Sequence, residues 1–125
     1  MELPGLKIAA SGPFDFPGRE RLKGKAEIRE VFNKKKLVSC QGAKLFILKN
    51  GLSHNRIAFT FSRKFGNAVE RNRARRLGRE AYRHLRKELK PGYDLVLLVY
   101  PGNDALRFRM KQLYDLLSRA GLFTV

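Results

Sequence analysis

The sequence predicts an α+β fold: a single two-layer sandwich of about four strands with three helices, in the order α-β-β-β-α-β-α. Three observations indicate this fold. Apolar residues recur at helical spacing in three segments, apolar runs or alternation occupy the segments between them, and Gly, Pro or Asn mark the junctions. The chain has 125 residues, which is long enough to bury the core of one such domain without disulfides or metals.

The first expected element is an amphipathic helix over about 24–35. Its apolar residues are interleaved with Lys and Arg at roughly helical spacing. They are Leu22, Ala26, Ile28, Val31 and Phe32. This segment therefore has one face that can pack on a sheet and one that faces water.

Strands are expected next over 42–51 and 55–62, with a weaker extended segment over 37–39 before them. The second of these strands alternates Ile57, Phe59 and Phe61 with smaller or polar residues. An Asn-Gly pair at 50–51 marks the turn between the strands. Further along, "YDLVLLVY" over 93–100 is a continuous apolar run, which is typical of a central strand covered on both faces.

Two more helices complete the fold. The second helix is expected to begin at Asn67, which forms a capping-box pattern with Glu70, and to stop before the Lys-Pro-Gly at 90–92. Its apolar stripe is Ala74, Leu77, Ala81 and Leu85. A last amphipathic helix carries Leu106, Met110, Leu113 and Leu117, with Phe108, Tyr114 and Leu116 beside them, and ends near Gly121.

The charge balance favours a polyanionic partner. The chain carries 27 Lys and Arg against 11 Asp and Glu, a formal net charge of +16. Because such a surface repels itself unless a polyanion lies nearby, nucleic acid is the first candidate partner. The sequence shows no amphipathic membrane anchor, lipidation signal or transmembrane span, so we expect no membrane partner.

The ends of the domain and its compartment follow from composition. Residues 1–18 lack the basic start and unbroken apolar stretch of a secretory signal, and we expect a flexible N-terminal tail there, followed by one domain over 19–125. Cys40 is the only cysteine, which excludes an internal disulfide. A reducing cytoplasm is the simple inference.

The second helix concentrates the cations. Arginines at spacings of three and four mildly destabilise an isolated helix, so an anionic partner is expected to compensate them. They are Arg71, Arg73, Arg75, Arg76, Arg79, Arg83 and Arg86. Arg grips phosphate bidentately, which Lys does not. Arg63 and Lys64 precede the helix in a glycine-bearing turn, and Asn72 could read a base or a 2′-hydroxyl.

These residues match a known pattern. "KFGNAVERNRARRLGREAY" resembles the signature of the protein component of bacterial ribonuclease P. The matching residues are Lys64, Gly66, Ala68, Arg71, Asn72 and Arg76. The resemblance extends more weakly over 19–121, where "RERLKGKAEIREVF" is similar to the family's opening helix and "GYDLVLLV" to its last strand. It implies a fold like the second domain of ribosomal protein S5.

The resemblance implies a protein cofactor of an RNA enzyme. In the family, the RNA and its bound Mg²⁺ remove the 5′ leader from precursor tRNA, and the polypeptide supplies no catalytic residues, holds no metal alone and needs no protein oligomer. The residues implied in RNA binding are Arg63, Lys64, Arg71, Asn72, Arg73, Arg75, Arg76 and Arg79. The wall of a leader-binding cleft between the first helix and the sheet would include Ile28, Phe32 and Phe46, with Lys64 at its edge. Ile28 stands where the family commonly has an aromatic residue.

The residues alone leave alternatives open. Aromatic platforms beside cations hold single strands, and Phe32, Phe46, Phe59 and Phe61 lie among basic residues, although core packing explains any single Phe as well. A structural RNA-binding protein, such as a ribosomal protein, suits the size and charge equally. A protein endonuclease is a poorer reading, because it would need converging carboxylates, and the acids at 15, 20, 27 and 30 are scattered.

Overall fold

The computed structural model describes residues 18–33, 36–102 and 104–124. In chain order the elements are η1 (Gly18–Glu20), α1 (Lys25–Asn33), β1 (Leu37–Cys40), β2 (Ala43–Lys49), β3 (Arg56–Phe61), α2 (Ala68–Leu85), η2 (Arg86–Glu88), β4 (Tyr93–Val99) and α3 (Leu106–Arg119). This order confirms the predicted α+β fold, including the weak first strand. The expected flexible tail lies outside the described residues except for Gly18, as does the expected end of the first helix at 34–35.

The sheet has the order β1-β2-β4-β3. β1 and β2 are antiparallel, β2 and β4 are antiparallel, and β3 runs parallel to β4. The Asn-Gly turn joins β2 to β3 as expected, and the Asn50 side chain accepts a hydrogen bond from the Leu52 backbone N–H at 2.7 Å. The two strands it connects do not pair, because β4 enters between them after the α2 crossover.

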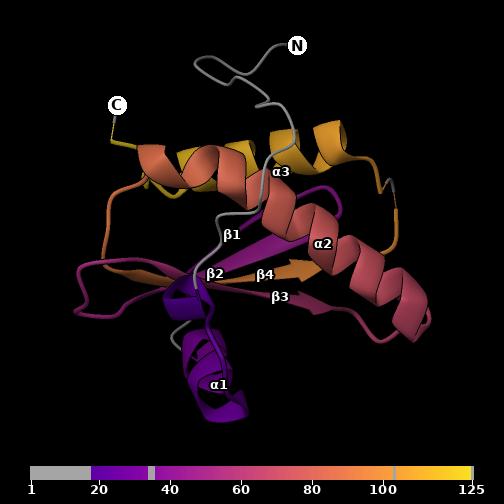
Figure 1. Cartoon of the computed structure of the whole chain (residues 1–125), viewed down its shortest axis with the longest axis horizontal. Helices are drawn as coiled ribbons and strands as arrows, with labels where there is room; N and C mark the ends of the chain where they lie inside the picture. The colour runs from indigo at the N-terminus through magenta and orange to yellow at the C-terminus, as the bar shows by residue number, and fades with distance from the viewer. Residues whose placement is uncertain (1–17, 34–35, 103, 125) are drawn as a thin grey trace.

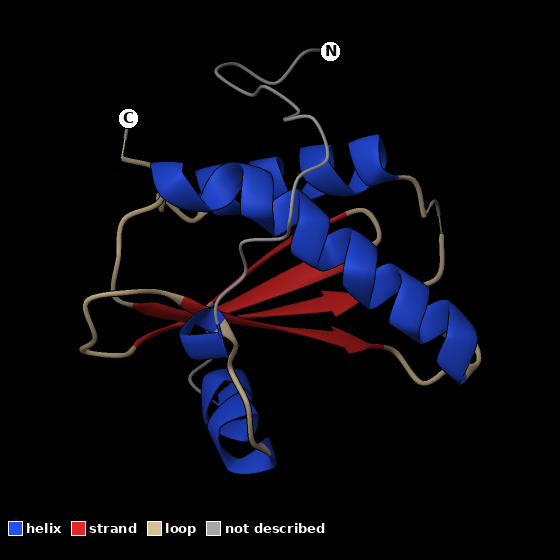
Figure 2. Ribbon diagram, viewed as in Figure 1, coloured by secondary structure: helices blue, strands red, loops and turns tan. Residues whose placement is uncertain are grey.

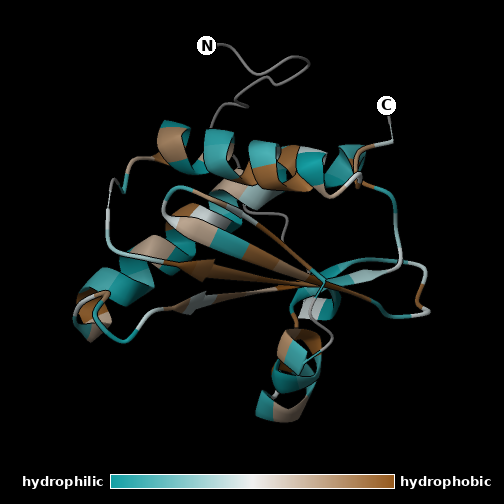
Figure 3. Ribbon diagram, turned by 180° about the vertical axis from the view of Figure 1, so that it is seen from behind, coloured by the Kyte–Doolittle hydropathy of each residue, from teal (hydrophilic) through white to brown (hydrophobic). Residues whose placement is uncertain are grey.

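The helices lie on opposite faces of the sheet. α2 and α3 cross one face side by side, and the shorter α1 packs against the other (Figures 1 and 2). Alternation along the strands divides the core accordingly: Leu95 and Leu97 pack in the larger cluster under α2 and α3, and Val96 packs in a smaller cluster with Val31 of α1. β4 is therefore the central strand, covered on both faces, and it is among the most apolar segments in Figure 3.

The smaller cluster holds α1 only partly against the sheet. Its buried members are Leu22, Val31, Ala58 and Val96. Half-buried apolar side chains surround them, namely Ile28 and Phe32 of α1 and Phe46 and Leu48 of β2. Because Phe46 and Leu48 are only half-buried, part of this face of the sheet remains accessible beside α1.

α2 packs on the sheet through the predicted stripe with one position changed. Ala74, Ala81 and Leu85 are buried as expected, but Leu77 is only half-buried. Gly78 and Tyr82 are buried in addition. A Cβ at Gly78 would lie 2.7 Å from the Phe59 ring, so the missing side chain allows α2 to approach β3 closely at this position.

α3 ends where the sequence indicated, at a left-handed glycine. Gly121 has φ 72° and donates to the Ser118 carbonyl, and Leu122 donates to the Leu117 carbonyl at 3.1 Å. This pair of hydrogen bonds is a Schellman motif. None of the described helices is long and apolar enough to cross a membrane.

Candidate nucleic-acid interface

The first turn of α2 is held by a complete capping box. The Asn67 side chain accepts a hydrogen bond from the Glu70 backbone N–H at 2.9 Å, and Oε1 of Glu70 accepts one from the Asn67 backbone N–H at 3.2 Å. Gly66, at φ 144°, makes room for this carboxylate, since a Cβ there would lie 2.8 Å from Oε1 of Glu70. The one acid in this basic region is therefore engaged with the positive end of its own helix.

The cations of α2 and of its C-cap fall into two groups, of which the C-terminal group is neutralised within the chain. Glu80 receives a hydrogen bond from Arg83 at 2.8 Å and a contact from Nε2 of His84 at 3.1 Å. The Arg83 hydrogen bond is the main reason that the pKa of Glu80 is lowered. Arg86 forms an ion pair with the buried Glu20 of η1. This end of the helix is therefore tied to the rest of the domain.

The N-terminal group has no such partners. Within the described part of the chain, no carboxylate lies in ion-pair range of its arginines, which are Arg71, Arg73, Arg75, Arg76 and Arg79. The pKa of Arg79 is lowered by burial and then by the positive charges of Arg21 and Arg75. A cluster of guanidinium groups without internal counter-charges is suited to binding an anion.

The preceding turn is docked on the same surface. Arg71 donates from Nη2 to the Arg63 backbone carbonyl at 3.2 Å, which joins the turn to the first half of α2. The rings of Phe61 and Phe65 pack with centroids 4.8 Å apart, and the Arg75 guanidinium lies 5.2 Å from the Phe61 centroid. Arg75 also donates to Oδ1 of Asn72 at 2.8 Å.

The structure brings the predicted RNA-binding residues together on one surface, the first half of α2 and the turn before it. Arg63, Lys64, Asn72, Arg73 and Arg76 are exposed, and Arg71, Arg75 and Arg79 are half-buried. We call these eight residues the α2 surface. Their contact with RNA remains a prediction, since no RNA is present.

Three of the predicted cleft residues also meet. Phe32 and Phe46 contact each other edge to face, with centroids 4.6 Å apart and an interplanar angle of 71°, and Ile28 packs in the same cluster. Lys64 is exposed in the turn after β3, and it makes no hydrogen bond or ion pair with another described residue. The structure shows no contact between it and the other three.

Phe59 and Phe61 do not belong to the α1 side of the sheet. Phe59 is buried against α2, and Phe61 packs with Phe65 on the edge of the larger cluster. Strand alternation accounts for this, since Ala58 faces α1 and the odd-numbered positions of β3, which include Phe59 and Phe61, face the other way. For Phe59, core packing is the correct reading.

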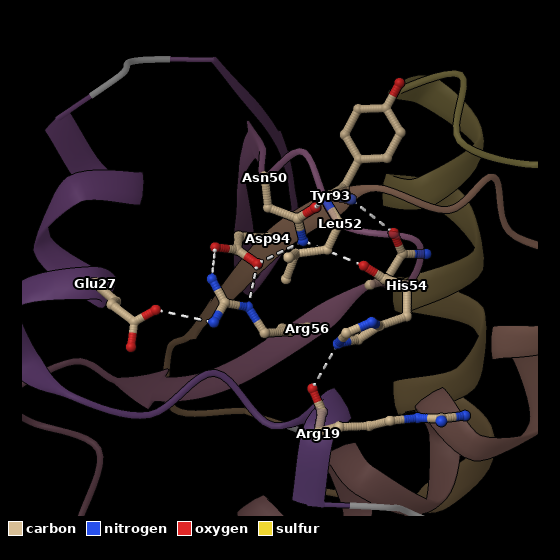
Figure 4. A network of polar contacts seen from close by, with 9 residues as sticks. Arg19, Glu27, Asn50, Leu52, His54, Arg56, Tyr93 and Asp94 are labelled. Carbon is tan, nitrogen blue, oxygen red and sulfur yellow. Dashed lines mark hydrogen bonds and ion pairs between the residues drawn. The ribbon is translucent and has the colours of Figure 1, made fainter.

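Sequence reasoning missed two features on the α1 side. The first is a polar network that joins α1 to the sheet (Figure 4). Arg56 makes a two-pronged contact with Asp94 at 2.8 and 2.7 Å and an ion pair with Glu27 of α1 at 2.9 Å, and Asn50 donates to Asp94 at 2.9 Å. The Asp94 hydrogen bond raises the pKa of Arg56. Glu27, considered as a nuclease acid, is thus an anchor for α1.

The second is a cation over an aromatic ring. Nζ of Lys44 on β2 lies 5.8 Å from the ring centroid of Tyr100, which follows β4. Strand alternation along β2 could have placed Lys44 on the same face as Phe46, but its position near Tyr100 depends on the pairing of β2 with β4.

In the described ranges, no group of three or more His, Cys, Asp or Glu side chains is placed to hold a metal ion. Of the acids considered for an endonuclease, Glu27 is paired with Arg56 and Glu20 with Arg86.

A small α+β domain whose helix presents arginines without internal counter-charges has the features of a nucleic-acid-binding protein. Comparison with known protein families identifies the family. The family model described as Ribonuclease P matches residues 16–120. The chain belongs to the ribonuclease P protein family.

Individual relatives agree with the family match. The ribonuclease P protein component of Clostridioides difficile (strain 630) is 38% identical over 85 residues, covering 67% of this chain and 75% of the relative. That of Clostridium botulinum (strain Loch Maree / Type A3) is 34% identical over 106 residues, covering 82% of this chain and 96% of the relative. Proteins of this name are components of an endoribonuclease complex that processes tRNA.

Solved structures show the same fold. The RNase P protein of Thermotoga maritima superposes with a TM-score of 0.70 at 27% identity, covering 81% of this chain and 97% of that one. The Staphylococcus aureus RNase P protein gives a TM-score of 0.75 at 22% identity, covering 84% and 98%. The second likeness concerns the fold alone.

Proposed function

We propose that this chain is the protein subunit of ribonuclease P, which binds the catalytic RNA and the 5′ leader of precursor tRNA and promotes Mg²⁺-dependent removal of that leader. The observation that carries the proposal is the division of α2. Arginines at its C-terminal end are neutralised by Glu80 and Glu20, whereas those at its N-terminal end have no carboxylate partner among the described residues. The family match gives the class of RNA that would supply the missing negative charge.

The α2 surface would contact the catalytic RNA. Its members are Arg63, Lys64, Arg71, Asn72, Arg73, Arg75, Arg76 and Arg79. Six of them lie on a helix whose first turn is fixed by the capping box, so the side chains start from a rigid backbone. Preorganised cations lose less conformational entropy when they bind phosphate, which supports this surface as the RNA-binding one.

The leader would lie along the α1 side of the sheet, against Ile28, Phe32 and Phe46, with Lys64 toward its phosphates. Phe32 and Phe46 are half-buried, so part of each ring remains available to a base. Aromatic faces hold bases with little regard to sequence, which suits leaders of different sequence. Ile28 offers an apolar contact in place of a stacking one.

The chemistry would belong to the RNA. Mg²⁺ would be held mainly by the RNA subunit, with none held by the protein alone, and the protein would act in the cytoplasm without needing to oligomerise. Its own contribution would be to neutralise phosphate charge and to add affinity for substrates that carry a leader.

Reconstitution tests the proposal. The purified protein is added to the ribonuclease P RNA of its own organism and a 5′-labelled precursor tRNA, at low Mg²⁺ and near-physiological salt. Cleavage at the mature 5′ end that requires both protein and RNA is the expected result. Tight RNA binding without any stimulation of cleavage would instead favour a structural RNA-binding protein.

A further inference from the structure

Asn72 and Arg75 form a hydrogen-bonded pair on the surface of α2. Nη1 of Arg75 donates to Oδ1 of Asn72 at 2.8 Å, one helical turn along. Asn72 is exposed and Arg75 is half-buried. Of the two, Asn72 therefore presents the more accessible polar group.

This contact fixes the orientation of the Asn72 amide. A guanidinium group has only donors, so the atom that faces Arg75 must be the carbonyl oxygen of the amide. The amide nitrogen is then directed away from Arg75, with both of its N–H groups, and no described residue accepts from it. Asn72 is thus prepared to donate rather than to accept.

Arg75 is itself held in place. Its guanidinium lies 5.2 Å from the centroid of Phe61, and Phe61 is supported by Phe65 at 4.8 Å. A cation over an aromatic face loses part of its freedom to reach outward. With one edge on Asn72 and one face toward Phe61, Arg75 has less reach toward a phosphate than the exposed Arg76, which has neither contact.

We infer that Asn72 donates a hydrogen bond to an acceptor on the catalytic RNA, and that Arg75 is a positioning residue that orients this amide. The acceptor is a phosphate oxygen, a 2′-oxygen or a base acceptor, all of which an amide N–H can meet. The inference rests on the proposed function and deepens it, because it divides the α2 surface into residues that neutralise phosphate, one amide that reads an acceptor and one arginine, Arg75, that orients this amide.

A double-mutant cycle on the full chain tests it. Affinity for the ribonuclease P RNA is measured for wild type, Asn72→Ala, Arg75→Ala and the double variant across a range of salt concentrations. Each single change is expected to weaken binding about tenfold, and the double variant to be no weaker than either. Arg75→Ala is expected to leave the slope of log K against log salt nearly unchanged, whereas Arg76→Ala reduces it by about 0.7 to 0.9.

The Asn72→Asp variant distinguishes loss of the donor to RNA from loss of the hydrogen bond with Arg75. Aspartate accepts the Arg75 hydrogen bond at least as well as asparagine but carries no donor, so RNA binding should weaken, and the loss should persist at high salt, where distant charges are screened. Circular dichroism and the thermal midpoint of each variant report on folding, which these surface changes should leave intact.

The outcomes separate this inference from the proposed function. If Arg76→Ala weakens binding but the effects of Asn72→Ala and Arg75→Ala simply add, the positioning role is wrong and the RNA surface stands. Wild-type binding by Asn72→Asp would likewise overturn the donor role. If Arg76→Ala also binds with wild-type affinity, the proposed RNA surface itself is wrong.

Discussion

The ring of Phe59 on β3 lies directly against Gly78 of α2: a Cβ at position 78 would come within 2.7 Å of two ring carbons. This contact sets how closely the arginine-bearing helix approaches the sheet. At this position, replacing glycine should improve helix propensity but worsen the steric fit against the ring.

Gly78→Ala should therefore destabilise the protein, although alanine is the better helix former. Alanine would gain about 1 kcal/mol of helix propensity, while forcing a methyl group into the Phe59 ring costs about 1–3 kcal/mol. Urea unfolding gives the difference. In a Phe59→Leu background the same change should cost less, and an equal cost in both backgrounds would show that the ring is not the cause.

Arg56 and Glu27 should contribute unequally to stability. Arg56→Ala leaves the carboxylate of Asp94, which is 4% exposed, with Asn50 as its remaining side-chain partner, and should cost about 3–5 kcal/mol. Glu27→Ala removes a half-exposed partner and should cost about 0–1 kcal/mol. Equal losses in denaturant unfolding would mean that α1 depends on this ion pair more than its exposure indicates.

The two ends of α2 should respond differently to loss of an arginine. Arg76→Ala should weaken RNA binding by about 1–3 kcal/mol and lower its salt dependence, with little effect on unfolding. Arg86→Ala leaves the buried Glu20 without this ion pair, so it should lower the free energy of unfolding and change the salt slope little. Filter binding across salt concentrations, combined with urea unfolding, checks both variants; the reverse pattern would place the RNA surface at the other end.

Phe32→Ala should reduce selectivity for substrates that carry a leader. The reconstituted enzyme should lose affinity for precursor tRNA by about 1–3 kcal/mol and keep its affinity for mature tRNA, because only the leader would stack on this ring. Leu48→Ala is the matched control, since Leu48 is a half-buried member of the same cluster without an aromatic face. Equal losses for both tRNAs, or for both variants, would argue against a leader site here.

The Glu80 cluster should make stability depend on pH at the acid end. Because Arg83 and then His84 lower the pKa of Glu80 in the folded state, its stabilisation is complete above the unfolded pKa and is lost as pH falls through the folded one. Wild type should thus be more stable than Glu80→Gln by about 1 kcal/mol near pH 6, and the difference should shrink as the solution is acidified below the ordinary Glu pKa. A constant difference would mean that the carboxylate charge is not involved.

Local features of the fold were predictable from the sequence, and long-range pairing was not. The capping box of Asn67 and Glu70 and the glycine at the end of α3 depend on residues within one turn, so their spacing reveals them. The strand order depends on where β4 enters the sheet, which alternation within a strand does not specify. Leu77 was misplaced for a similar reason, because which side chains α2 buries depends on how the helix packs against distant strands.

In the candidate site, too, local features were predictable from the sequence and long-range contacts were not. The cations of α2 were evident from composition, but which of them have partners depends on Glu20 and Glu80 reaching particular arginines. The orientation of the Asn72 amide follows from an i,i+3 contact that several residues on this helix could have made. Phe46 and Phe59 lie on opposite faces of the sheet because of their positions in the alternation of their strands, which composition does not reveal.

The position of β4 has a consequence for synthesis of the chain. β2 and β3 share no backbone pairing and are hydrogen-bonded into one sheet only through β4, which is made after both strands and after α2. A nascent chain that ends before Tyr93 would therefore carry the basic helix without the sheet that supports it. The α2 surface would gain its final support only when the last part of the chain is made, so an unfinished chain would present these arginines on a helix that is not yet packed on its sheet.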